Sequence, residues 1–319
     1  MKLTKLDKAA ENAILICMGA KPKEKILVVS DEIKRNIGLC IYENAKRLGF
    51  ESLYVEMKAR NYNGEEPPEE MATLMKEFDI VFCPTAKSLT HTEARRNASA
   101  SGVRVATLPG ITDDIMIRGL SADYNKIAER TIKLQKIFEK TKIVRVTSPS
   151  GTDISMDISA RKAFASKGLF HNKGESGNLP TGETYVAPNE GKSNGIIVVD
   201  GSMAAIGMLS RPIAIEVKDG YAVKISGGTE AKKLKQILDK FGKPAYNIAE
   251  FGIGTNDKAK LSGAILEDEK VMGTIHIALG DNASMGGSVK VSSHLDGVIL
   301  KPTVYFDEKI IMKNGKLII

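Results

Sequence analysis

The sequence predicts an α/β fold, in which an N-terminal doubly wound parallel sheet is followed by a mixed, β-rich α+β domain. In the first part of the chain, short apolar runs alternate with amphipathic segments of helix length, which is typical of βαβ units. After about residue 142 the apolar residues recur with period two, and turn signals separate the predicted strands into pairs. This change of period predicts a Rossmann-like α/β domain over residues 1–141 and a β-rich domain over residues 142–319.

Each predicted strand of the first domain is a short, continuous apolar run, as expected for a strand that is buried on both faces. The segments between these runs carry apolar residues at helical spacing, and Gly49 follows one of them, where a helix C-terminus favours glycine. We expect strands at 25–30, 52–56, 79–84 and 103–108, and helices at 3–18, 33–48, 67–78, 92–100 and 121–140.

Hairpin signals organise the second domain. Ser150-Gly151, Asp219-Gly220 and Asn314-Gly315 each separate two segments of alternating apolar residues, and Asp-Gly is among the strongest short turn signals. We expect paired strands at 143–147 and 153–158, at 213–217 and 221–225, and at 309–312 and 316–319, with a helix at 230–241.

The composition is that of a folded globular protein, with 42% hydrophobic and 27% charged residues. The net charge of +7 is spread along the chain, tryptophan is absent, and no basic stripe is interleaved with aromatic residues, so we expect no nucleic-acid partner. No apolar run approaches the roughly 18 residues that span a bilayer, and the N-terminus lacks the apolar core of a signal peptide. We therefore expect a cytoplasmic protein without a membrane partner.

Two histidines in the second half of the chain are candidate metal ligands. Cys17, Cys40 and Cys83 form no Cys-x-x-Cys pair, which argues against a thiolate zinc site. His294 and Asp296 lie two residues apart in a strand-like segment, 290–300, so both side chains point to one face, where they suit a divalent metal. His276 lies in the apolar segment 273–280. A surface His–Asp pair and a core histidine are the alternatives.

Two glutamates and a third histidine are further candidates. Glu250 lies inside the strand-like run 247–256, where an unpaired buried carboxylate would be costly. Glu183 follows a loop rich in proline and glycine, the kind of rigid loop that often positions functional side chains, although a surface turn is equally compatible. His91 follows the third predicted strand, at the edge where open α/β sheets bind ligands, and is a candidate substrate contact. The acidic run 267–269 is interpreted as a solvated loop.

Four blocks of sequence together resemble the aminopeptidase T family of metallopeptidases: Gly177–Glu183, Glu250–Asn256, Gly273–Gly280 and His294–Asp296. In that family two adjacent divalent ions lie between carboxylates and histidines. The resemblance implies a metal-dependent aminopeptidase, a hydrolase that releases N-terminal amino acids from small peptides through a metal-activated water, and a homodimer. It implies two Zn or Co ions per chain, with Glu250 and Glu183 as catalytic residues. The implied metal ligands are Glu183, Glu250, His276, His294 and Asp296.

The sequence departs from these peptidases in two ways. It has no tyrosine in the segment 281–287, where the peptidases carry a tyrosine ligand, and the chain is shorter than theirs. The same superfamily contains 2,5-dihydroxypyridine dioxygenases of about this length, with a single ferrous ion held by two histidines and a carboxylate. His276, His294 and Asp296 would supply that set. A dioxygenase with one Fe(II), which cleaves a dihydroxylated aromatic or pyridine ring, is therefore the alternative function. A non-catalytic metal-binding or ligand-binding protein is the second.

Overall fold

The computed structural model describes residues 3–319, which form two compact units. Unit 1 contains the described residues up to Ala128 together with Ser166–Thr181, and unit 2 contains Glu129–Ala165 and Gly182–Ile319. The chain therefore leaves unit 1, returns to it for one short segment, and then completes unit 2. The domain boundary between residues 141 and 142 remains a prediction, since the two units are defined by compactness and one of them is discontinuous.

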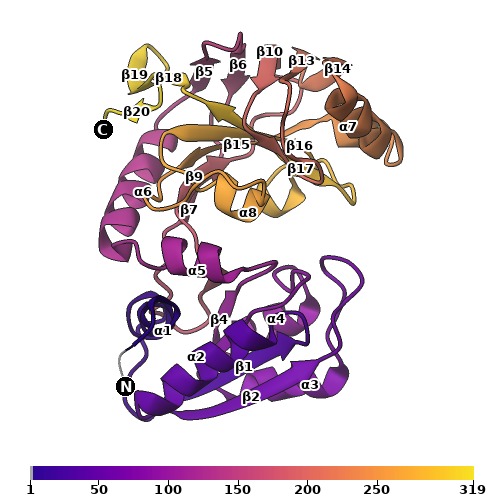
Figure 1. Ribbon diagram of the computed structural model, residues 1–319. Coiled ribbons are helices and arrows are strands. Elements are labelled where there is room, and N and C mark those ends of the chain that lie inside the picture. The colour runs from indigo at the N-terminus through magenta and orange to yellow at the C-terminus, as the bar shows by residue number, and fades with distance from the viewer. Residues whose placement is uncertain (1–2) are drawn as a thin grey trace. The chain divides into compact units, whose positions relative to one another are not determined.

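Unit 1 is built on a five-stranded parallel sheet with the order β2-β1-β3-β4-β8 (Figure 1). On one face, Leu27 and Val29 pack against side chains of α3 and α4. On the other face, Gly38 of α2 lies against Ser30. Helices thus cover both faces, which confirms the predicted doubly wound parallel sheet. The strands of unit 1 are β1 (Lys25–Asp31), β2 (Glu51–Met57), β3 (Ile80–Cys83), β4 (Arg104–Thr107) and β8 (Ser176–Asn178).

Polar caps set the starts of several helices in unit 1. Thr4, Thr92 and Thr112 each accept a hydrogen bond from a backbone N–H in the first turn of the helix that follows. The sequence pattern did not predict α5, a helix of two turns. The helices are α1 (Lys5–Glu11), which continues as a π-helix over Asn12–Cys17, α2 (Arg35–Arg47), α3 (Glu69–Leu74), α4 (Glu93–Ala100), α5 (Asp113–Gly119) and α6 (Tyr124–Phe138), which runs into unit 2.

Unit 2 contains an eight-stranded sheet with the order β14-β13-β10-β6-β5-β18-β19-β20. All three predicted hairpins lie in it, and the two turn pairs Asp219-Gly220 and Asn314-Gly315 adopt positive φ, as tight hairpin turns require. Its strands are β5 (Ile143–Thr147), β6 (Asp153–Asp157), β10 (Ser193–Val199), β13 (Ile213–Lys218), β14 (Tyr221–Ser226), β18 (Thr303–Phe306), β19 (Lys309–Lys313) and β20 (Lys316–Leu317).

A second sheet of unit 2 has seven strands in the order β12-β11-β17-β16-β15-β9-β7. The predicted β-rich second part of the chain is therefore confirmed, with α7 (Thr229–Asp239) as its predicted helix. Of the expected irregular loop, residues 179–182 are irregular, whereas Gly177 and Asn178 belong to β8 and Glu183 begins β9. The strands are β7 (Phe164–Ser166), β9 (Glu183–Val186), β11 (Ser202–Met203), β12 (Gly207–Met208), β15 (Ile248–Gly254), β16 (Thr274–Gly280) and β17 (His294–Leu300), and α8 (Ile265–Asp268) lies between β15 and β16.

One face of the seven-stranded sheet is apolar and belongs to the core that it shares with the eight-stranded sheet and helices α6 and α7. Phe251 stacks on Phe138 with ring centroids 5.7 Å apart, and Phe138 meets Phe306 edge-on at 4.7 Å. These rings join β15, α6 and β18. Because side chains alternate along a strand, this apolar face leaves the other face of β15, β16 and β17 to a different set of residues.

None of the helices that the structure describes between residues 3 and 319 is long and apolar enough to cross a bilayer.

Removal of one ring from the aromatic core should destabilise unit 2. We expect Phe251→Ala to lower the free energy of unfolding by about 3–5 kcal/mol, because a fully buried ring is replaced by a cavity. Phe241→Ala, at a side chain that is 37% exposed, is the control and should cost less than about 1 kcal/mol. Urea unfolding followed by circular dichroism measures both. Equal losses would show that the three rings do not form the core.

Candidate metal centre

Four neighbouring strands, β9, β15, β16 and β17, bring all five predicted ligands to one face of the seven-stranded sheet. Glu250 and Asp296 both pair with Ala278, one from each side of β16. His276 lies two residues before Ala278, and His294 pairs with Gly280, two residues after it. Residues that pair directly across antiparallel strands, and those two apart on a strand, share a face. The sequence therefore places these groups together through strand register.

Glu183 joins the same face from the next strand. It pairs with Gly254, which lies four residues after Glu250 on β15. The interior of this face is lined by small residues, and Gly252 shows why. A Cβ atom at position 252 would lie 2.0 Å from His276 Nε2, so any side chain there would displace the imidazole.

The carboxylate of Glu250 lies between the two imidazoles. Its Oε1 is 3.1 Å from His276 Nε2, and its Oε2 is 3.2 Å from His294 Nε2. Asp296 Oδ1 lies 3.6 Å from the same His294 nitrogen, and Glu183 Oε2 lies 3.5 Å from His276 Nε2. Two groups of potential ligand atoms result, Glu183/Glu250/His276 and Glu250/His294/Asp296, and Glu250 belongs to both.

The donor set fits a divalent metal ion. Imidazole nitrogen and carboxylate oxygen are ligands that several divalent ions accept, and no cysteine belongs to either group among the described residues. Within residues 3–319, Glu183 Oε2 is one of the buried side-chain atoms that have no hydrogen-bond partner. Since a buried carboxylate oxygen without a donor is costly, a cation next to His276 would satisfy it. The cluster is therefore suited to bind a divalent metal.

The imidazoles and Glu250 shift one another's pKa values. Burial opposes a charge on His276, but the hydrogen bond to Glu250 and the charges of Glu183 and Glu250 outweigh it and raise the pKa to about 9. The same balance, with Asp296 and Glu250 as partners, raises the pKa of His294 well above its ordinary value. Burial also opposes ionisation of Glu250, yet the two histidines hold its pKa well below its usual range. Without metal, protons occupy the positions that a cation would take.

A buried lysine is the main feature of the site that the sequence did not predict. Lys270 is 4% exposed, and its Nζ donates to Glu183 Oε1 at 2.6 Å and to Glu269 Oε1. Burial, together with Asp296 and Glu183, raises the pKa of Glu269 to about 8 against the opposing charge of Lys270. The interpretation of 267–269 as a solvated loop is wrong: Glu267 and Asp268 are buried too, and they accept backbone N–H groups of the loop 260–263.

Tyr185 is a second residue that sequence reasoning missed. It lies two residues after Glu183 and pairs with Gly252, so it shares the face of the ligands. Its ring stacks on Phe164 with centroids 5.4 Å apart. Burial and the neighbouring charges of Glu183 and Glu250 raise the pKa of its phenol, which therefore keeps its proton at neutral pH. Tyr185 could have been predicted from the sequence, because it lies two residues from Glu183 on a strand, the same spacing that placed His294 and Asp296 on one face.

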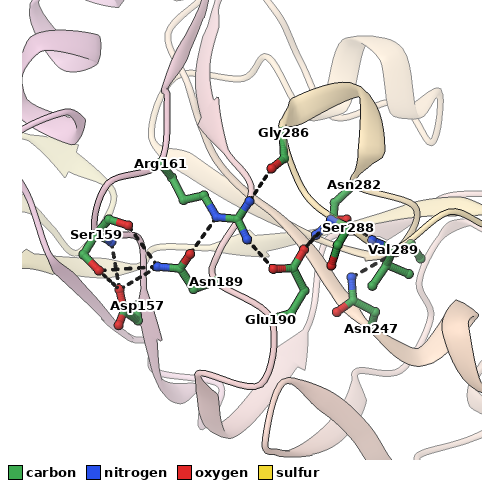
Figure 2. A network of polar contacts seen from close by, with 11 residues as sticks. Asp157, Ser159, Arg161, Asn189, Glu190, Asn247, Asn282, Gly286, Ser288 and Val289 are labelled. Carbon is green, nitrogen blue, oxygen red and sulfur yellow. Dashed lines mark hydrogen bonds and ion pairs between the residues drawn. The ribbon is translucent and has the colours of Figure 1, made fainter.

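The loop between β16 and β17 is held from outside by a polar network, shown in Figure 2. Arg161 donates to Glu190 and to the carbonyl of Gly286. Glu190 Oε1 in turn accepts from Asn282 Nδ2 at 2.9 Å and from the backbone N–H of Ser288 at 2.7 Å. The Asn282 side chain, in the segment 281–287 that has no tyrosine, therefore forms part of this network.

This loop contacts His294 directly. The backbone N–H of Asp281 donates to the carbonyl of Ser293 at 2.8 Å, which closes the loop at its base. The carbonyl oxygen of Asp281 lies 2.8 Å from His294 Nδ1. A proton on Nδ1 would leave Nε2 free for a metal, and such contacts commonly orient metal-binding histidines.

His91 lies in unit 1, apart from this cluster in the sequence and in a different compact unit. It is exposed and immediately precedes Thr92, whose hydroxyl caps α4, and its carbonyl accepts from Arg96 Nη1 at 2.7 Å. Its role as a substrate contact remains a prediction.

Comparison with known proteins connects this site to a family. The family model for 2,5-dihydroxypyridine 5,6-dioxygenase matches residues 8–319. The 2,5-dihydroxypyridine 5,6-dioxygenase of Pseudomonas putida is 23% identical over 248 residues, which cover 72% of this chain and 69% of that protein. The solved structure of 2,5-dihydroxypyridine dioxygenase from Pseudomonas putida has a TM-score of 0.84 at 18% identity, over 99% of this chain and 98% of that one.

AmpT of Thermus thermophilus shares the fold at a lower TM-score. Its solved structure has a TM-score of 0.68 at 16% identity, over 99% of both chains. The family model supports the dioxygenase part of the predicted superfamily, and the likeness to AmpT, at 16% identity, shows a shared fold. The prediction of a metallo-aminopeptidase, and with it a metalloprotease or any other peptide hydrolase, is wrong, because the family model and the curated relative are dioxygenases. The four blocks of sequence encode the candidate metal-binding face of this chain, and histidines with carboxylates serve more than one reaction, so the blocks could not identify the activity.

The match over residues 8–319 decides between the two branches, and this chain belongs to the 2,5-dihydroxypyridine 5,6-dioxygenase family.

Proposed function

We propose that this protein is a ring-cleaving dioxygenase that opens a dihydroxylated pyridine or a closely related aromatic ring. The observation that carries the proposal is the convergence of two imidazole nitrogens on the carboxylate of Glu250, with Asp296 beside them, in a member of a dioxygenase family. Two histidines with a carboxylate are the donor set of mononuclear non-haem iron oxygenases.

We propose that His276, His294, Glu250 and Asp296 hold a single Fe(II) ion. His276 and His294 would bind through Nε2, the nitrogen of each ring that faces the carboxylates. A ferrous ion bound there supplies the one-electron chemistry that dioxygen needs before it reacts with a closed-shell ring. The carboxylates of Glu250 and Asp296 balance its charge and lower the cost of its burial.

The remaining residues of the face bind and orient the substrate in this proposal. The phenol of Tyr185 keeps its proton, so it can donate a hydrogen bond to a ring oxygen, and its ring together with Phe164 offers a flat surface for an aromatic substrate. His91 remains a proposed substrate contact from unit 1. In the reaction, one bond of the ring breaks and both atoms of O₂ end in the product.

Loss of one candidate ligand should remove metal and activity together. We expect Glu250→Gln to lower the metal content and the rate of ring cleavage at least a hundredfold, because Glu250 lies between both imidazoles. Glu308→Gln, at an exposed glutamate of the same unit, should change neither. The measurements are metal content by mass spectrometry and oxygen uptake with 2,5-dihydroxypyridine after anaerobic loading with Fe(II). An unloaded wild type that consumes oxygen at the full rate, or a fully active Glu250→Gln, would sink the proposal.

Metal binding should release protons from the two histidines. At pH 7 both imidazoles are protonated in the metal-free protein, since their pKa values are raised, so binding of one Mn²⁺ should release about two protons. The affinity should therefore rise as the pH increases toward the raised pKa values of the two histidines and level off above both. Calorimetry in buffers of different ionisation enthalpy counts the protons. His171→Gln, at a histidine of unit 1, should leave the count unchanged, and a wild-type count of zero would contradict the assignment.

The loop network should affect the metal through His294. We expect Glu190→Gln to weaken Mn²⁺ binding by about tenfold or more, because it breaks the pair with Arg161 and loosens the loop whose Asp281 carbonyl contacts His294 Nδ1. The electron paramagnetic resonance spectrum of bound Mn²⁺ should change as well. Asp153→Asn breaks the exposed pair with Arg145 and serves as control. An unchanged spectrum and affinity in Glu190→Gln would mean that the network only stabilises the fold.

A further inference from the structure

The five candidate ligands could surround two cations, because they form two groups that share Glu250. A carboxylate between two groups of ligands is a common bridge between adjacent metal ions. The number of ions that the cluster accepts therefore depends on what else lies next to it. Lys270, a charged residue beside Glu183 to which the proposed function assigns no role, bears on the number of ions.

Lys270 brings a permanent positive charge to the group that contains Glu183. Its Nζ lies 2.6 Å from Glu183 Oε1, a direct ion pair in which both side chains are almost fully buried. A second hydrogen bond, to Glu269 Oε1, fixes the ammonium in place. Lysine is almost never fully buried unless it is paired, so an ammonium that is 4% exposed depends on these two carboxyl partners.

We infer that the ammonium of Lys270 takes the place of a second divalent cation beside Glu183, so that the cluster binds one metal ion. The inference rests on the proposed function for the identity of the site, and it adds the reason for the number of ions. It assigns Lys270 as a charge-balancing residue, which acts through Glu183 and does not touch the reacting atoms.

The charges of the candidate ligands agree with this assignment. Glu183, Glu250 and Asp296 carry three negative charges, while Glu269, the second partner of Lys270, has a pKa raised to about 8 by burial and keeps its proton at pH 7. Lys270 then reduces the three negative charges to two, which one divalent ion neutralises when the imidazoles are neutral. A second ion bound to Glu183 would lie a few ångströms from the ammonium, in a buried environment where like charges repel strongly. Glu183 Oε2, the oxygen without a hydrogen bond, remains available on the side of His276, where it can face a single ion.

Sequence position explains why this residue is easily overlooked. Lys270 precedes the β16 segment and follows an acidic run, so it reads as a surface lysine in a charged loop. In the fold, the isolated bridge between Asn256 and Val271 draws this segment alongside the end of β15. Gly254 allows the approach, because a Cβ atom there would lie 2.2 Å from the carbonyl oxygen of Val271.

The number of bound ions tests the inference. Titration of metal-free protein with Mn²⁺, followed by electron paramagnetic resonance and equilibrium dialysis, should give one isolated Mn²⁺ per wild-type chain. Lys270→Met should bind two, with the broadened signal of adjacent, exchange-coupled ions. Lys270→Arg keeps the charge and should bind one. Lys258→Met, at an exposed lysine of the same unit, removes an equal charge and should also bind one.

Lys270→Met leaves two carboxylates without their partner and can fail to fold. The double variant Lys270→Met/Glu269→Gln removes one of those carboxyl groups and carries the same test. Two ions in the wild type, or a single ion in folded Lys270→Met or in the folded double variant, would overturn the inference. These outcomes are distinct from failure of the proposed function: a wild type that binds one ion and cleaves no ring would refute the dioxygenase proposal alone.

Discussion

The structure of the site depends on the need to bury several carboxylates together on one face of a sheet. Glu183, Glu250 and Asp296 are each less than 9% exposed, and like charges at such short range would destabilise the fold if nothing compensated them. The negative charges of these carboxylates are balanced by two kinds of cation: the protonated imidazoles of His276 and His294, and the ammonium of Lys270. A metal ion can replace the protons on the imidazoles, whereas it cannot replace the lysine. In the metal-free protein the buried carboxylates are therefore neutralised by protons on the imidazoles, and in the metal-bound protein by the metal ion.

One face of the seven-stranded sheet packs into the core of unit 2, and the other carries the candidate metal ligands. Phe251 packs into the aromatic core, while its neighbours Glu250 and Gly252 serve the opposite face. This division places the candidate ligands on paired strands whose opposite face is buried in the core, in contrast to a site made of loops. The exception is the loop between β16 and β17, which connects two ligand-bearing strands and is held by Glu190. The paired strands set the backbone positions of the ligands. The network around Glu190 holds the loop whose Asp281 carbonyl contacts His294 Nδ1 and so orients that imidazole.

Part of the fold and of the candidate site could be predicted from the alternation of apolar and polar residues along strands, together with turn signals. The period of two placed His294 and Asp296 on one face, and the Asp219-Gly220 and Asn314-Gly315 turns identified hairpins that the structure contains. Pairing between strands could not be predicted, because nothing local states that Glu250 and Asp296 both pair with Ala278. The strand β8 was missed since its residues, Ser176–Asn178, are not apolar, and the edge of a parallel sheet accepts such a strand through backbone hydrogen bonds alone.

The error in the predicted activity has a physical origin. Peptide hydrolysis and ring cleavage can both use histidines and carboxylates, so the ligands that give a sequence its resemblance say little about which reaction follows. What differs is the number of cations and the groups around them. Lys270 and the commitment of Asn282 to Glu190 are both outside the ligand set, and neither belongs to a recognisable motif. If one ion and one ammonium share the carboxylates, a two-ion mechanism loses its second Lewis acid, while chemistry at a single redox-active ion loses nothing. A single buried lysine would then favour chemistry at one ion over a two-ion mechanism on the same set of ligands.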